Sequence, residues 1–362
     1  MSSFSSESHI PNGVIENGQS GWLWPREAGE FVQQNTNLVT FNADKVKEAA
    51  KLIYEEAKKN SLNKIEFHSH ELHPKFDNPE ETARWVFFAD TINFAFWCDD
   101  GASVDYNGKN YTGYYSAAAC MKRALDNGWN WAFDPYRMQT FDKNDINRIF
   151  MGKLPLPELR QKALNEAGRI IVEKYGGQVL NLLKAANGSA QKLLRLLVQD
   201  FTSYRDSTTF KGKKLLFLKR AQIFAADVYS ALKDNPQTPY VNFTDINSIT
   251  MFADYRVPQV LYHFGILNYA DSLTKHLKSL KLIKKNSEME TAIRGLSIFA
   301  CETAPSLQKI TEEVGNLCKT NGQLDRTVNS ADVDVFLWLY RREHSAEIEK
   351  AIPHHMVVTW FY

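Results

Sequence analysis

The sequence is poor in cysteine and has no excess of charge of either sign. Its 362 residues include four cysteines without CxxC spacing, at Cys98, Cys120, Cys301 and Cys318. They predict reduced thiols rather than a disulfide framework or a zinc site. This favours a cytoplasmic protein, with the nucleus as an additional compartment. The 43 basic and 42 acidic residues leave a net charge of +1, so we expect no stable nucleic-acid binding.

Long apolar runs and common catalytic motifs are also missing. No window approaches 18 apolar residues, which excludes a membrane span. The polar N-terminus lacks the basic and apolar regions of a signal peptide. No Walker loop, strand-borne GxGxxG, HExxH or GxSxG is present, which argues against common nucleotide hydrolases, dinucleotide enzymes and zinc or serine hydrolases. We therefore expect no cofactor.

Three histidines, His68, His70 and His73, lie close enough together to raise the question of a metal. No nearby second cluster supplies the remaining ligands, so the sequence predicts no metal site. His73 precedes Pro74 and is better placed as a hydrogen-bonding loop residue.

The periodicity predicts a mainly α protein with a small β hairpin. Residues 1–30 are expected to be a flexible tail, and residues 31–362 a single domain. Asn107-Gly108 between apolar residues is typical of a type I′ hairpin turn. Trp85–Trp97 fits a strand or a buried helix equally well. Helices are predicted over Asp44–Asn60, Tyr114–Asn127, Glu158–Tyr175, Leu215–Leu232, and after the capping residues Ser189, Ser287 and Ser330.

The stretch Asn247–Tyr269 places charged residues in a break between two apolar runs. Pro258 suits the first turn of a helix, and the residue before a proline favours extended geometry. We expect a non-helical elbow at Asp254–Val257, followed by a helix that ends at Gly265. A carboxylate held there could carry chemistry. Alternatively, Asp254 and Arg256 cap helix ends and pair with each other.

The predicted helix Leu215–Leu232 carries charges at the edge of its apolar face. Arg220 and Asp227 lie there, where an unpaired charge is costly. One interpretation is a structural Arg220–Asp227 link or a pair with a neighbouring helix. The other makes Lys219 or Arg220 an anchor for a phosphate.

Several aspartates occur among aromatic residues. Asp254, Asp332 and Asp334 accompany rings at Phe94, Phe96, Trp97, Phe252, Tyr255 and Trp338. A carboxylate can stabilise an oxocarbenium-like sugar or activate water, and aromatic rings can hold a flat leaving base. This combination suits cleavage of a glycosidic bond to a base. Alternatively, Asp332 and Asp334 only favour the N-terminal turn of their helix.

Five stretches of the sequence are distinctive: NFAFW (Asn93–Trp97), YTGYYS (Tyr111–Ser116), NEAGRII (Asn165–Ile171), FLKRAQI (Phe217–Ile223) and TMFADYRVPQVL (Thr250–Leu261). They resemble the queuosine salvage protein family, whose members are queuosine 5′-phosphate N-glycosylases. The resemblance runs from about Phe31 to the C-terminus. It implies a monomeric, mostly helical enzyme that hydrolyses queuosine 5′-phosphate to queuine and ribose 5-phosphate, so that queuine can enter tRNA. It also implies a fold like that of helix-hairpin-helix DNA glycosylases, with which a helix–Gly265–helix arrangement in Val260–Tyr269 is compatible.

The resemblance implies roles for individual residues. Asp254 becomes the nucleophile or the transition-state stabiliser. Phe252, Tyr255 and Trp97 would line the base pocket, and Lys219, with Arg220, would contact the 5′-phosphate. His73 and Asp334 would contact the base or its aminomethyl-cyclopentenediol arm, whose amine favours a carboxylate.

Two other classes of function stay open. One is a glycosylase that acts on a base within DNA or RNA, against which the near-neutral charge counts. The other is a non-catalytic nucleotide- or tRNA-binding helical protein, which would keep the aromatic residues without needing Asp254.

Overall fold

The structure is a computed structural model that describes residues 21–46, 48–49, 51, 55, 69–98, 101–302 and 329–362. Most of the predicted helix Asp44–Asn60 lies outside these residues, as do His68 and Cys318. The mainly α prediction is confirmed, since helices dominate and the strands are short. No helix among the described residues is long and apolar enough to cross a membrane.

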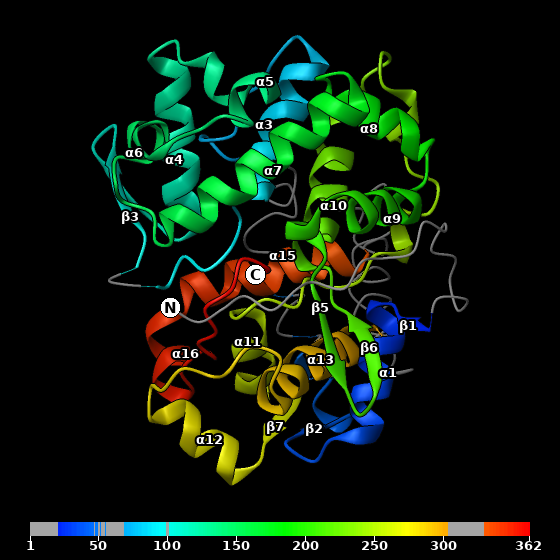
Figure 1. The fold of residues 1–362 in the computed structure, drawn as a ribbon. Coiled ribbons are helices and arrows are strands. Elements are labelled where there is room, and N and C mark those ends of the chain that lie inside the picture. Colours follow the sequence, from blue (N-terminus) through cyan, green and yellow to red (C-terminus); the bar gives the residue numbers. More distant parts are fainter. Residues whose placement is uncertain are drawn as a thin grey trace.

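One group of helices surrounds the larger of two hydrophobic cores and occupies the upper part of Figure 1. Helix α3 is its centre, because almost every residue from Thr82 to Thr91 is buried. The predicted segment Trp85–Trp97 is therefore helical up to Thr91 and then irregular. The helices of this group are α3 (Pro79–Thr91), α4 (Tyr114–Asp126), α5 (Pro135–Met138), α6 (Lys143–Phe150), α7 (Pro157–Tyr175), α8 (Val179–Ala186), α9 (Ala190–Asp200) and α10 (Lys219–Leu232).

The remaining helices pack around a second core in the lower part of Figure 1. Helices α1 and α13 cross closely because each has a glycine at the contact: a Cβ on Gly295 would come within 2.6 Å of the Val32 Cβ, and one on Gly29 within 2.9 Å of the Phe299 nitrogen. These helices are α1 (Pro25–Asn35), α11 (Val257–His263), α12 (Asp271–Lys278), α13 (Glu288–Glu302), α15 (Ser330–Glu343) and α16 (Ser345–Ala351).

The strands form three small sheets. The predicted hairpin is confirmed as β3 (Ser103–Tyr106) and β4 (Lys109–Thr112), with positive φ at both turn residues Asn107 and Gly108. The other two sheets were not predicted from the sequence. They are β1-β6-β5 (Trp22–Leu23, Lys213–Leu216, Ser207–Phe210) and β2-β7 (Val39–Phe41, Leu267–Tyr269).

Local signals located most helix boundaries correctly. Ser189 caps α9 by accepting a hydrogen bond from the Lys192 amide, and α7 ends at Gly176, which has a left-handed conformation. The irregular backbone before Pro258 is confirmed, with α11 beginning one residue earlier at Val257.

Four expectations need correction. The predicted helix Leu215–Leu232 begins only at Lys219, because Leu215 and Leu216 pair in strand β6. Residues Trp22–Glu30, assigned to the tail, form β1 and the start of α1, because Pro25 opens this helix and its apolar face packs on α13. The cap of α15 is Asn329 rather than Ser330. Gly265 is followed by the strand β7, which pairs with β2, so no helix–glycine–helix arrangement occurs at Val260–Tyr269.

Candidate functional site

A cavity of about 570 Å³ contains most of the predicted site residues. Helices α4 and α10 of the first core and helix α15 of the second contribute side chains to its wall. Its size is typical of a site for one small molecule. The predicted residues that line it are His73, Trp97, Lys219, Phe252, Asp254, Tyr255 and Asp334.

The floor of the cavity is the irregular segment 250–256, whose backbone amides are bound by side chains. Gln222 Oε1 accepts from the Thr250 amide at 2.7 Å, and Glu302 Oε1 from the Met251 amide at 3.0 Å. The Phe252 amide donates to Asp334 Oδ1 at 2.9 Å. Buried backbone outside helices and sheets needs such partners. The segment is therefore held in one conformation by α10, α13 and α15.

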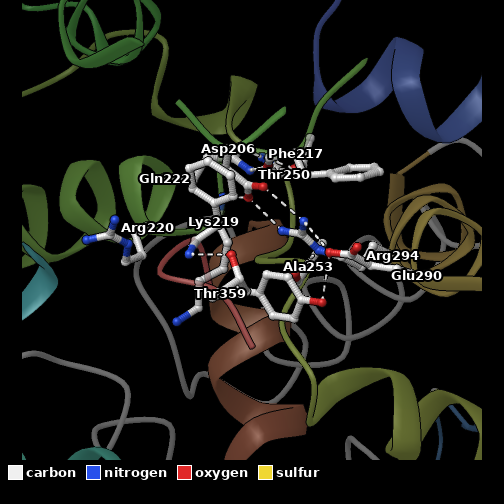
Figure 2. Close-up of polar contacts among 12 residues, drawn as sticks. Asp206, Phe217, Lys219, Arg220, Gln222, Thr250, Ala253, Glu290, Arg294 and Thr359 are labelled. Carbon is white, nitrogen blue, oxygen red and sulfur yellow. Dashed lines mark hydrogen bonds and ion pairs between the residues drawn. The ribbon is translucent and has the colours of Figure 1, made fainter. Parts of the chain in front are cut away.

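A buried ion pair also holds the segment 250–256 in place. Arg294 donates to both carboxylate oxygens of Asp206, at 2.9 and 2.6 Å, and through Nε to the Ala253 carbonyl at 2.8 Å. Asp206 also accepts from the Lys219 amide at 3.1 Å. Figure 2 shows Arg294 between Asp206 and Ala253, close to the start of α10. Asp206 thus links the two stretches that carry Lys219 and Asp254.

Asp254 is fixed through one oxygen. Its Oδ1 accepts hydrogen bonds from the amides of Arg256 and Val257, both at 2.8 Å, at the N-terminus of α11. Its Oδ2 accepts none from the described residues. Burial raises the pKa of this carboxyl, whereas the charge of Lys219 and the two amides lower it. The residue is in the cavity wall, so Oδ2 is the oxygen available to a ligand.

Asp334, on α15, is the second carboxylate beside this segment. Burial raises its pKa well above the ordinary value, and the charge of Asp254 raises it further. The amide of Phe252 and the charge of Lys219 act in the opposite direction. Two neighbouring carboxylates with unequal support favour one ionised and one protonated member. Asp254, with two amides on its Oδ1, is the better-supported anion.

Lys219 is the first residue of α10 and is buried. Its Nζ donates to the backbone carbonyl of Asn93 at 3.0 Å and to Asn93 Oδ1 at 3.2 Å. Burial lowers the pKa of Lys219 to about 8, while the negative charges of Asp254, Asp90 and Asp334 raise it. The ammonium therefore balances carboxylates at this end of the cavity.

Two further acidic groups face Lys219. Asp90 is completely buried on α3, and Asp227 lies on α10 in the cavity wall. Burial raises the pKa of Asp227 to about 7, and Lys219 lowers it. Burial and the neighbouring Asp227 raise the pKa of Asp90 well above its ordinary value. The carboxyl groups of Asp254, Asp334, Asp90 and Asp227 thus all lie within electrostatic range of Lys219.

Another part of the cavity wall is basic. Arg256, Arg341, Arg342 and His354 line it, and Glu349 lies among them. Glu349 accepts from Arg256 at 3.0 Å and pairs with Arg341 and with His354. Burial lowers the pKa of His354, whereas its hydrogen bond with Glu349 raises it.

Aromatic rings complete the cavity. Trp97 and Tyr255 both lie against His354, with ring centroids 5.6 and 5.4 Å apart. His73 Nε2 lies 3.0 Å from the Tyr114 hydroxyl, which places His73 on the side of α4. Flat apolar walls of this kind suit a heterocyclic ligand.

Arg220 and Asp332, two of the predicted contacts, are not among the cavity-lining residues. Arg220 is buried in the first core, where it donates to the carbonyls of Asp90, Thr91 and Ser203 at the end of α3 and beyond. Asp332 accepts from the Asn329 amide in the capping box of α15. Both therefore have structural contacts, and the Arg220–Asp227 link is not among those that hold Arg220.

Sequence reasoning did not assign several cavity residues, among them Arg341, Arg342, His354, Tyr114, Tyr115 and His70. Tyr114 and Tyr115 lie in the YTGYYS stretch, which was a usable signal. The twin arginines end a helix, where basic residues are common for electrostatic reasons alone. Among the described residues no group of three or more histidines, cysteines, aspartates or glutamates could hold a metal ion.

Comparison with known proteins identifies the family. The sequence model of the queuosine salvage protein family matches residues 72–362. The chain belongs to the queuosine salvage protein family. It is 37% identical over 351 residues to a Bos taurus protein named queuosine 5′-phosphate N-glycosylase/hydrolase, covering 94% of this chain and 99% of that protein.

More distant relatives of this family carry the same name. A Schizosaccharomyces pombe protein is 34% identical over 334 residues, covering 88% of this chain and 91% of that protein. A Sphaerobacter thermophilus protein is 32% identical over 288 residues, covering 79% and 83%. The match to the family includes all the cavity residues described above except Ser69 and His70.

Proposed function

We propose that this protein hydrolyses the N-glycosidic bond of queuosine 5′-phosphate. The bond between C1′ and the base breaks, a water molecule supplies the hydroxyl at C1′, and queuine and ribose 5-phosphate leave. The observation that carries this proposal is the position of Asp254. Its carboxylate is fixed by the amides of Arg256 and Val257 and has one oxygen left for a ligand in an aromatic cavity.

Asp254 acts on the sugar. As C1′ loses the base, positive charge develops on the ribose ring, and a fixed carboxylate stabilises it more strongly than water can. Because Oδ1 is already bonded, Oδ2 can meet this charge or the attacking water without reorganising the segment. Lys219 supports the ionised form of Asp254 through its charge.

Asp334 and the aromatic rings act on the base. A 7-deazaguanine has no N7, the usual site of protonation when a purine leaves, so the enzyme depends on hydrogen bonds to the rest of the base. Asp334 has a strongly raised pKa and, in its protonated form, is the donor to the departing base. Phe252, Tyr255 and Trp97 hold the ring, and His73 contacts the base or its arm.

Chromatography of the reaction products tests this function. Purified protein is incubated with queuosine 5′-monophosphate, with queuosine nucleoside, and with an RNA oligonucleotide that contains queuosine. Queuine release from the free nucleotide supports the proposal. Release from the oligonucleotide alone would indicate a base-excision glycosylase. Intact substrates with a folded protein would leave a binding role.

The proposal includes a monomer in a reducing compartment, the cytoplasm or nucleus. Cys120 and Cys301 are buried free thiols, which agrees with that compartment.

A further inference from the structure

The residues that line the cavity include an acidic group around Lys219 and a group of basic residues. Near the second core, three arginines, Arg256, Arg341 and Arg342, line the wall, and among the described residues Glu349 is the carboxylate that pairs with them. The wall therefore keeps a positive excess even with His354 neutral. Burial and the charge of Arg256 lower the pKa of Arg341 and of Arg342, so the guanidinium groups lie close enough to repel one another electrostatically.

Arg342 is held in place but is not neutralised. Its Nη1 donates to the Thr112 carbonyl at 3.2 Å, and its guanidinium lies over the rings of Tyr115 and Trp338, at 4.7 and 5.2 Å from their centroids. It forms no ion pair with any residue that the structure describes. A guanidinium has five donors in a rigid fork. Most of those of Arg342 remain for a ligand.

The surroundings of Lys219 are unsuited to a phosphate. Lys219 Nζ is already bonded to Asn93, and the carboxyl groups of Asp254, Asp334 and Asp90 lie within electrostatic range of it. Asp227 adds a fourth carboxyl within range of this lysine. A phosphate dianion here would be repelled by the ionised Asp254. Arg220, the other residue predicted to bind the phosphate, donates its hydrogen bonds to backbone carbonyls of the first core.

We propose that Arg256, Arg341, Arg342 and His354 form the subsite for the 5′-phosphate of the substrate. The proposal rests on the proposed function and assigns the orientation of the nucleotide within the cavity. Asp254 and Arg256 are two residues apart, so their Cα atoms are separated by at most about 7.6 Å. One ribose 5-phosphate can thus place C1′ at Asp254 and its phosphate at the basic wall. Bidentate contacts from arginine suit a phosphate better than a single lysine does.

The test compares substrates with and without the phosphate in Arg342→Gln. We expect kcat/KM for queuosine 5′-monophosphate to fall about 10- to 100-fold, as for loss of a hydrogen bond to a charged group. The kcat/KM for queuosine nucleoside should stay within roughly twofold. Arg342→Lys should recover part of the loss by keeping the charge. Arg169→Gln, which breaks an exposed Arg169–Glu173 pair, is the matched control and should match the wild type with both substrates.

Calorimetric binding of ribose 5-phosphate gives a readout that does not depend on catalysis. Wild-type protein should bind ribose 5-phosphate and not ribose, and Arg342→Gln should weaken that binding by a similar factor. An unchanged preference for the monophosphate in Arg342→Gln, or an equal loss with both substrates, would overturn the subsite. If the wild type releases no queuine from either substrate, the proposed function fails, and the calorimetry alone then decides whether this wall binds phosphate.

Discussion

Arg294 and Asp206 form a two-hydrogen-bond ion pair inside the protein, with side chains only 2% and 3% exposed. The same arginine binds the carbonyl of Ala253, next to Asp254, and the same aspartate binds the amide of Lys219. One buried pair thus links the backbone at Lys219 to the backbone beside Asp254. Burying two charges is costly. Here the buried pair holds the cavity wall in one position.

Removing one member of this pair should destabilise the protein strongly. Arg294→Met leaves the Asp206 carboxylate buried without its partner, which typically costs about 3–5 kcal/mol. The loss is measured as the change in the free energy of unfolding by urea denaturation. Arg169→Gln, at an exposed pair on α7, should change it by less than about 1 kcal/mol. Equal effects from the two variants would mean that Asp206 and Arg294 do not hold the site.

A glycine in α13 should resist replacement by alanine. Helix propensity favours alanine over glycine by about 1 kcal/mol in an open helix. At Gly295, however, a Cβ would lie 2.6–2.7 Å from three carbons of Val32 on α1. Gly295→Ala should therefore lower the free energy of unfolding by about 1–3 kcal/mol, measured in urea. A gain in stability would show that α1 and α13 move apart at little cost to make room for the added Cβ.

The buried carboxyl group of Asp227 should make the protein less stable as pH rises. Asp227 has a pKa near 7 in the folded protein, raised by burial, against an ordinary value of 3.8. Between these values the folded state binds more protons than the unfolded state, so the contribution of Asp227 to stability is lost as pH rises from about 4 to 7. Asp90 and Lys219 are the charged groups beside it.

Asp227→Asn isolates this contribution. The free energy of unfolding of the variant, relative to the wild type, should increase as pH is raised from about 5 to about 8, since the variant carries no charge to bury. Urea denaturation of both proteins at the two pH values measures it. The exposed Asp105, replaced in the same way, serves as a control. A difference that is flat with pH would mean that Asp227 titrates normally.

The parts of the fold that depend on neighbours in sequence were predictable. Ser189 marks a helix start, Asn107-Gly108 a hairpin turn, and Pro258 the break that displays Asp254, because each acts through its own backbone. Asn329 and Ser330 are both good caps one residue apart, and only tertiary packing chooses between them.

The parts that depend on distant segments were not predictable from one sequence. Strand β2 pairs Val39 with Tyr269, a partner that no local pattern indicates. Arg220 and Lys219 are adjacent, yet one side chain lies in the core and the other in the cavity. The charge on a helix edge showed that a partner was needed but not whether it was a carbonyl or a ligand.

Queuine release by Asp254→Asn tests the proposed role of Asp254 most directly. Asparagine keeps an oxygen for the Arg256 and Val257 amides, so the variant should unfold at the same urea concentration as the wild type within experimental error. It loses the negative charge, and kcat for queuosine 5′-monophosphate should fall at least about 10³-fold. That result, with a folded protein, would establish Asp254 as the group that acts on the sugar. Turnover close to that of the wild type would contradict the central claim and remove Asp254 from the chemistry.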